Sequence, residues 1–159
     1  ARLAEQLPED AESIEAIGAK ILERGIEGRE FEFTPVTIHG DLHIGQIFVD
    51  ETSPSLLSGL LDIDTAGTGD PADDAAALYA HLATFGESLL DADPEAAHRC
   101  LDLADASLAR WRFNANAGFE SRARAIAATH LLGHALRPLS VDPDALSRRL
   151  LDRARSLVS

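Results

Sequence analysis

The chain opens with apolar residues at helical spacing. Residues 8–24 place acidic side chains early and a glycine, Gly25, directly after the last turn, as is usual at the two ends of a helix. The apolar positions fall on one helical face: Ile14, Ile17, Ile21 and Leu22. The pattern predicts a helix over residues 8–24.

Three short apolar segments come next, and each has the length and composition of a strand. They cover residues 36–38, 47–50 and 56–63. A Thr-Ser-Pro-Ser turn at residues 52–55 separates the second segment from the third. We therefore expect an antiparallel hairpin formed by residues 47–50 and 56–62.

Beyond residue 64 the pattern becomes helical. Three of the segments begin with an Asp-Pro pair, in which the acid can cap the helix and the proline suits its first turn. The predicted helices cover residues 71–90, 94–111, 119–136 and 143–157. We expect one mainly helical α+β domain, in which the helices and the small β-hairpin insert form a common core.

The net charge and the single cysteine limit which binding partners and which cellular compartment are possible. The 159 residues carry a formal net charge of −13, which argues against nucleic acid or an anionic membrane as a partner, since both require a basic face. The charge suits a cationic ligand, although acidic surfaces also serve solubility alone. One cysteine excludes an internal disulfide and fits a cytoplasmic location, and no apolar run reaches the roughly 18 residues of a membrane span.

Candidate chemistry concentrates in residues 39–46, HGDLHIGQ, between two of the predicted strands. Two glycines allow a sharp turn or the close approach of a ligand. Asp41 can take a proton from a hydroxyl group, and Gln46 offers an amide oxygen suited to Mg²⁺. The spacing of this acid and amide is that of kinase catalytic loops, in which the Asp orients or deprotonates the acceptor and the amide binds metal.

A second acidic motif lies at the end of the third predicted strand. Residues 59–71, GLLDIDTAGTGDP, place Asp62 and Asp64 where a strand leaves its sheet, and carboxylates at that position can reach a bound metal. Each motif alone also fits a simpler interpretation, in which Asp41 forms an Asx-turn and the two later acids are solvated. Both motifs together, in this order and beside strands, favour a kinase-type site.

The two motifs resemble those of the aminoglycoside phosphotransferase and choline kinase family of small-molecule kinases. The family pattern is H-G-D-x-H-x-x-N, a strand, a second strand ending in I-D, and then G-D-P-x-x-D. The chain matches at His39, Gly40, Asp41, His43, Asp62, Gly69, Asp70, Pro71 and Asp74. The resemblance implies the C-terminal lobe of the protein-kinase-like fold, ATP as phosphoryl donor, Mg²⁺ as cofactor and a small-molecule hydroxyl as acceptor.

Carried to the matching positions, the resemblance implies that Asp41 is the catalytic residue and that Asp62 and Gln46 bind Mg²⁺. Gln46 replaces the usual Asn of the family and is one methylene longer. A glutamine here is similar to the maltokinase and glucosamine kinase branch, which favours a sugar or amino sugar as acceptor. Residues 59–71, in contrast, are more similar to the general phosphotransferase pattern.

The remaining motif residues have supporting roles in this interpretation. Asp64 is either an auxiliary metal group or a solvated acid. Asp74 and His39 are expected to hold the catalytic loop by hydrogen bonds. His43 is expected to support the loop as well, with contact to phosphate or acceptor as the alternative.

Two histidines outside the motifs, His130 and His134, lie one helical turn apart. Pairs with this spacing occur in metal sites, but no H-E-x-x-H pattern is present. We expect both to be core or semi-exposed residues.

A kinase of this fold also needs a nucleotide lobe with a glycine-rich loop and a lysine that pairs with the phosphates. Neither precedes residue 36, and the one lysine, Lys20, lies within a predicted helix. We expect residues 1–159 to be the C-terminal lobe alone, with the nucleotide lobe absent from this chain and the fragment inactive by itself.

Two function hypotheses remain. One is the catalytic lobe of an ATP- and Mg²⁺-dependent phosphotransferase acting on an aminoglycoside, amino sugar or sugar, and intact Asp41 and Asp62 favour it. The other is a kinase-like binding module without catalytic activity, which the replacement at Gln46 and the missing lobe favour.

Overall fold

The computed structural model describes residues 2–53, 55–111, 118–136 and 142–159. The helices are α1 (Arg2–Gln6), α2 (Ala11–Arg29), α3 (Pro71–Leu89), α4 (Pro94–Trp111), α5 (Phe119–Ala135) and α6 (Pro143–Val158). Three short 3₁₀ turns are η1 (Pro8–Asp10), η2 (Ile44–Gln46) and η3 (Ile63–Thr65). The strands are β1 (Val36–Ile38), β2 (Ile47–Val49), β3 (Leu57–Leu60) and β4 (Gly67–Gly69). The mainly helical α+β class is confirmed.

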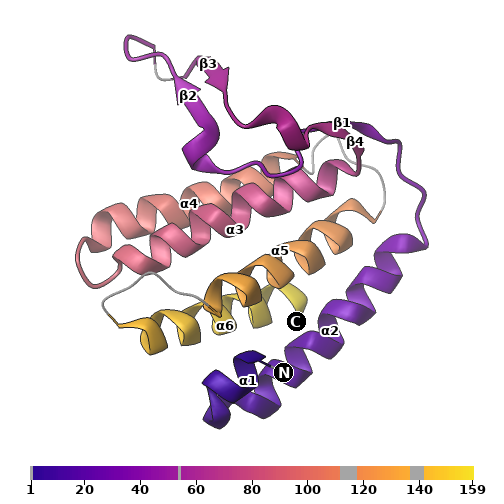
Figure 1. Ribbon diagram of the computed structural model, residues 1–159, viewed down its shortest axis with the longest axis vertical. Helices are drawn as coiled ribbons and strands as arrows, with labels where there is room; N and C mark the ends of the chain where they lie inside the picture. Colours follow the sequence, from indigo (N-terminus) through magenta and orange to yellow (C-terminus); the bar gives the residue numbers. More distant parts are fainter. Residues whose placement is uncertain (1, 54, 112–117, 137–141) are drawn as a thin grey trace.

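Helix α3 lies at the centre of the helical part, and its small side chains make this possible. Its buried alanines are at most 4% exposed: Ala72, Ala75, Ala76, Ala77, Ala80 and Ala83. Neighbouring helices can approach such a surface closely, and α3 packs on α4 and α5, while α5 packs on α2 and α6. Figure 1 shows the α3–α4 layer with α5, α6 and α2 on one side and the hairpin on the other. Among the helices that the structure describes, none combines the length and apolar composition that a membrane span requires.

The Asp-Pro pairs set the helix starts as predicted. The carboxylates of Asp70, Asp93 and Asp142 each accept a backbone N–H bond of 3.0 Å from the first turns of α3, α4 and α6. The position of β1 and of the loop that follows it depends on the first of these starts, because β4, which pairs with β1, leads directly into α3.

Helix α2 differs from the prediction, since it continues past Gly25 to Arg29. A glycine inside a helix costs roughly 0.5–1 kcal/mol relative to alanine, and the packing of α2 on α5 outweighs this cost. Near the end of α2, the carbonyl of Gly28 accepts a 3.1 Å bond from Arg122 Nη1 of α5. A Cβ at Gly28 would lie 2.4 Å from Arg122 Cγ, so this contact requires glycine.

The predicted hairpin is present, and a further strand is present that the sequence does not indicate. Strands β2 and β3 pair antiparallel, and β3 ends at Leu60, so Asp62 lies beyond the strand. Strand β4 has the sequence Gly-Thr-Gly, which carries no apolar pattern, yet it pairs antiparallel with β1. A Cβ at Gly69 would lie 2.4 Å from Ile38 Cδ1, so the pairing depends on a small residue there.

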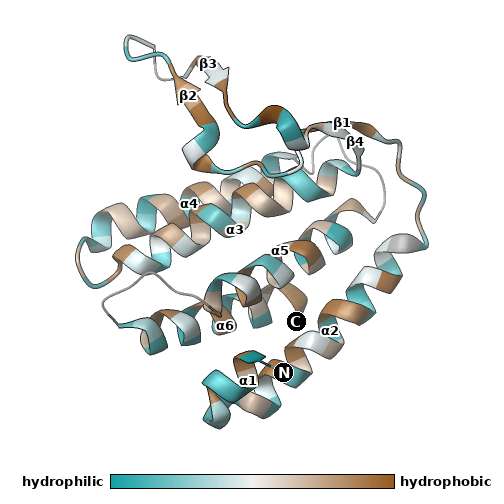
Figure 2. Ribbon diagram, in the orientation of Figure 1, coloured by the Kyte–Doolittle hydropathy of each residue, from teal (hydrophilic) through white to brown (hydrophobic). Residues whose placement is uncertain are grey.

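The hairpin does not contribute to the core, contrary to expectation. Its large apolar side chains and those just beyond it are 43–65% exposed: Phe48, Val49, Leu56, Leu57, Leu60, Leu61 and Ile63. Figure 2 shows apolar segments of β2 held away from the helices. The core is therefore helical, and the hairpin presents an apolar surface of the kind that usually contacts another surface.

Candidate active site

The loop that follows β1 is held by a side chain of α3. Asp74, in the first turn of α3 and 7% exposed, accepts backbone N–H bonds from His39 at 2.7 Å and Gly40 at 2.9 Å. Hydrogen bonds to a carboxylate are stronger than those between neutral groups. The structure thus places Asp74 and His39 in contact and fixes the start of the loop to α3.

The same loop is tied to the segment after β3. His39 Nε2 donates to the carbonyl of Leu61 at 2.7 Å, and Thr65 Oγ1 donates to the carbonyl of His39 at 2.9 Å. Gly40 has φ 87°, and a Cβ there would lie 2.6 Å from the Thr65 carbonyl oxygen. Only glycine fits this position without strain. Asp41 comes next in the chain, and its side chain is exposed.

Gln46 and Asp62 meet at the base of the hairpin. Gln46 Nε2 lies 3.4 Å from Asp62 Oδ2, and the backbone N–H of Leu61 donates to the Gln46 carbonyl at 2.9 Å. Gln46 is 4% exposed, and its side-chain Oε1 has no hydrogen-bond partner among the described residues. A buried acceptor without a partner costs about 1–3 kcal/mol. The two motifs of the sequence therefore converge on one point.

The backbone of Asp62 adopts a left-handed conformation, with φ 56° and ψ 46°. Asp62 is the one non-glycine residue with positive φ in the described part of the chain. This conformation costs roughly 1–2 kcal/mol for most residues with a Cβ and less for Asp, and backbone strain of this kind concentrates at functional sites. The strained turn lies just beyond the end of β3 and brings the Asp62 carboxylate to Gln46.

The donor chemistry of this pair suits a hard cation. A carboxylate and an unpartnered amide oxygen are ligands that Mg²⁺ takes, and Mg²⁺ is commonly held by one or two carboxylates together with phosphate oxygens and water. Asp64 lies two residues further on, in the exposed turn η3. Across the described residues, no group of three or more His, Cys, Asp or Glu side chains is placed to hold a metal.

The model of the phosphotransferase enzyme family matches residues 1–113. The chain belongs to the phosphotransferase enzyme family. The resemblance to aminoglycoside phosphotransferases and choline kinases is thereby confirmed, and the match contains both motifs and every predicted site residue. Searches among curated proteins and among solved structures each gave no match.

This phosphotransferase-family chain has a buried ion pair that no sequence pattern predicts. Arg122 of α5 bonds Asp70 through its Nε and, at 3.3 Å, through its Nη2, and both residues are at most 8% exposed. The same guanidinium lies 5.1 Å from the ring centre of Phe33. The pair joins α5 to the start of α3, just before Asp74. The partners are 52 positions apart, and no local pattern connects them.

Histidines of α3 and α5 lie within electrostatic range of the predicted catalytic Asp41. Burial lowers the pKa of His81 to about 4, while the Asp41 charge acts in the opposite direction. Burial also lowers the pKa of His130, again against the charge of Asp41. His130 and His134 are partly buried, as predicted. Helical periodicity alone does not single out His81, so the sequence does not predict its place beside the loop.

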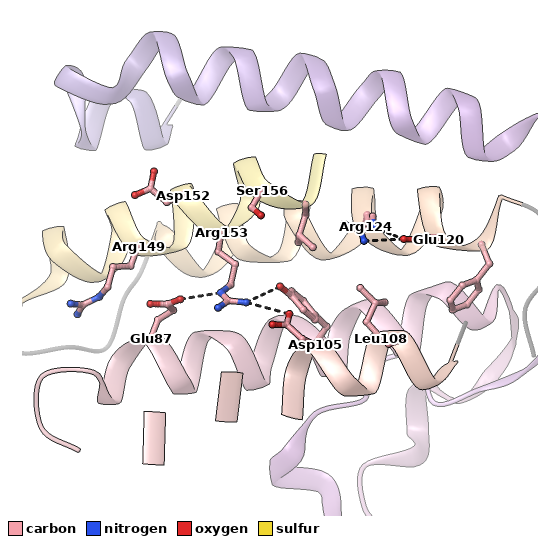
Figure 3. A pocket seen from close by; sticks show the side chains of 13 residues that line it. Glu87, Asp105, Leu108, Glu120, Arg124, Arg149, Asp152, Arg153 and Ser156 are labelled. Atoms are coloured by element: carbon pink, nitrogen blue, oxygen red, sulfur yellow. Dashed lines mark hydrogen bonds and ion pairs between the residues drawn. The ribbon is translucent and has the colours of Figure 1, made fainter. Parts of the chain in front are cut away.

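A cavity of about 690 Å³ lies elsewhere, between α3, α4, α5 and α6, and none of the predicted site residues lines it (Figure 3). Arg153 of α6 lies at its centre and donates to Glu87 at 3.0 Å, to the Tyr79 hydroxyl at 3.0 Å and to Asp105 at 3.5 Å. These contacts connect α6 to α3 and α4. Their role is structural, since the charged groups at the centre pair with one another.

Proposed function

We propose that this chain is the catalytic lobe of a phosphotransferase that uses ATP and Mg²⁺ to phosphorylate a hydroxyl group of a small molecule. The observation that carries the proposal is the buried Gln46 oxygen without a partner among the described residues, beside the strained Asp62. A half-turn of the Gln46 amide would bring this oxygen to face the Asp62 carboxylate. An amide oxygen and a carboxylate oxygen can face each other stably when both bind the same cation. Membership of the phosphotransferase family supports the reaction class.

The proposal gives each residue one role. Asp41 accepts the proton of the acceptor hydroxyl while that oxygen bonds to the terminal phosphorus of ATP and the bond from this phosphorus to the ADP oxygen breaks. Asp62 and Gln46 would hold Mg²⁺, which supplies neutralisation of the phosphate charge. Asp74 and His39 hold the loop that carries Asp41. Asp64 is an auxiliary group for the metal.

The nucleotide-binding lobe, in this proposal, is a part of the protein outside residues 1–159. The chain has no glycine-rich loop with a paired lysine ahead of the catalytic loop. The exposed apolar side chains of the hairpin, next to Gln46 and Asp62, are where we place the contact with that lobe. Reliance on ATP and the single cysteine are consistent with a cytoplasmic location.

For the acceptor we propose an aminoglycoside, amino sugar or sugar. The net charge of −13 and the glutamine at position 46 favour a hydroxylated cation. Turnover of ATP by the protein with its nucleotide lobe should be compared for aminoglycosides, glucosamine, maltose and choline. Turnover with neutral sugars alone would refute the cationic part of this proposal.

The decisive variant is Asp41→Asn in the protein with its nucleotide lobe. The change is nearly isosteric but removes the proton acceptor, so kcat should fall by about 10²–10⁴-fold. KM should change little, because Asp41 acts on the transition state. A parent protein that binds ATP and Mg²⁺ without turning over any acceptor would instead favour the binding module, the second candidate, which the replacement of Asn by Gln46 supports.

A further inference from the structure

Four imidazoles from three elements form a continuous row beneath the catalytic loop. The ring of His43 in the loop lies 4.7 Å from the ring of His81 in α3, with an angle of 30° between the planes. His81 in turn lies 4.7 Å from His134 in α5, edge to face. His130, one turn before His134, completes the row at 6.4 Å. The family match ends at residue 113, so the α5 end of this row lies outside it.

His43 determines the shape of turn η2, which carries Gln46. Its Nδ1 accepts the backbone N–H of Gly45 at 3.1 Å, and its carbonyl accepts the backbone N–H of Gln46 at 3.0 Å. A ring nitrogen that accepts an N–H bond carries no hydrogen, so the His43 hydrogen is on Nε2. A Cβ at Gly45 would lie 3.1 Å from both Cε1 and Nδ1 of His43. The ring therefore lies directly over the Gly45 amide.

The ring of His43 is held from the helical side. His81 is partly buried in α3 and meets the His43 ring, and it is backed by His134. His134 Nδ1 lies 2.7 Å from Thr84 Oγ1, so its orientation is fixed by a hydrogen bond to α3. The contacts thus run without a break from α5 through α3 to the turn of Gln46.

We infer that His81 is a positioning residue for the metal-binding turn: its ring holds the His43 ring over the Gly45 amide and thereby fixes Gln46 opposite Asp62. This inference rests on the proposed function for its meaning in catalysis, but the contacts themselves do not. An outer partner that orients a ligand typically changes metal affinity or activity by 10–100-fold when it is removed. Burial lowers the pKa of His81 and keeps it neutral near pH 7, so its ring meets His43 without charge repulsion.

The test compares His81→Ala with His81→Phe, which keeps a flat ring, in the full chain. One readout is the backbone amide of Gly45, followed by its ¹H–¹⁵N shift and hydrogen exchange. The second is Mg²⁺ affinity, followed at the side-chain amide of Gln46. His81→Ala should accelerate exchange at Gly45 and weaken Mg²⁺ binding by about tenfold. His81→Phe should leave the Gly45 exchange rate and the Mg²⁺ affinity at the values of the parent chain. His98→Ala, which replaces an exposed histidine in α4, should change neither quantity.

His81→Leu fills the same space without a flat ring, and it replaces the alanine variant if that variant does not fold. Unchanged Gly45 exchange and unchanged Mg²⁺ affinity in either variant would overturn the positioning role. A failure of the proposed function would look different, because the parent chain would then bind no Mg²⁺ that depends on Asp62. The Gly45 amide would still decide the role of His81 in that case.

Discussion

The replacement of Asp74 by asparagine is the most direct test of how the loop that contains Asp41 is held. Asp74 offers two carboxylate oxygens, and each accepts one backbone N–H of the loop. Asparagine keeps one oxygen and turns an NH₂ group toward the other N–H. The substitution therefore removes one bond and leaves a buried donor unpaired, without changing the size of the side chain.

The cost can be worked out from these contacts. A hydrogen bond to a charged group contributes about 1.5–3 kcal/mol, and a buried group left without a partner costs about 1–3 kcal/mol. Because the two effects overlap at one N–H, we expect the free energy of unfolding to fall by about 3 kcal/mol. For a domain of this size the midpoint of thermal unfolding should then drop by about 6–12 °C.

Asp73 provides a matched control in the same helical turn. Burial raises the pKa of its carboxyl, as do the charges of Asp70 and Asp74. Its charge is thus unfavourable in the folded chain at neutral pH, and Asp73→Asn should leave stability unchanged or raise it. Urea unfolding of both variants at pH 7, with exchange of the His39 and Gly40 amides, measures the difference. Equal stability of the two variants would show that Asp74 does not hold the loop as described.

Three further predictions concern other contacts. Asp62→Asn should keep the fold, because asparagine tolerates positive φ, yet weaken Mg²⁺ binding in a titration, whereas Asp62→Ala should also lose roughly 1–2 kcal/mol of stability. Arg122→Met should lower the free energy of unfolding by about 3–5 kcal/mol, since Asp70 is left charged and buried, and adding Asp70→Asn should recover part of this loss. Acidification from pH 6.5 to about 4 should lower the free energy of unfolding, because burial lowers the pKa of His81 and the unfolded chain therefore binds a proton that the folded chain does not. In urea unfolding, His81→Phe should make the free energy of unfolding depend less on pH over this range.

Local sequence patterns predicted most of the fold because most of its elements carry local signals. The Asp-Pro pairs marked three helix starts, and the hairpin was expected from two apolar segments around a turn. The patterns failed where tertiary contacts decide. Helix α2 passes Gly25 because α5 packs against it, and β4 forms because its glycines fit against Ile38.

In the candidate site, too, local patterns predict some contacts, and tertiary packing decides the others. Gln46 and Asp62 could be paired in advance because a hairpin brings its two ends together. The partners from distant elements could not be paired in this way. The contact of Arg122 with Asp70 depends on how α3 and α5 cross, and that of His81 with His43 depends on where the loop lies against α3. A residue that acts through another residue leaves no motif of its own in the sequence.

The glutamine at position 46 depends both on local sequence and on contacts with distant elements. It has one more rotatable bond than the asparagine of the family pattern, and holding a longer side chain in one position costs more conformational entropy. Burial restricts that side chain, and the bond from the Leu61 N–H fixes the backbone at Gln46 from one side. The His43 ring fixes the turn from the other side, and His81 holds that ring. A longer side chain can keep its amide group opposite Asp62 when its backbone is held this firmly, so the glutamine and the histidine row belong to one arrangement.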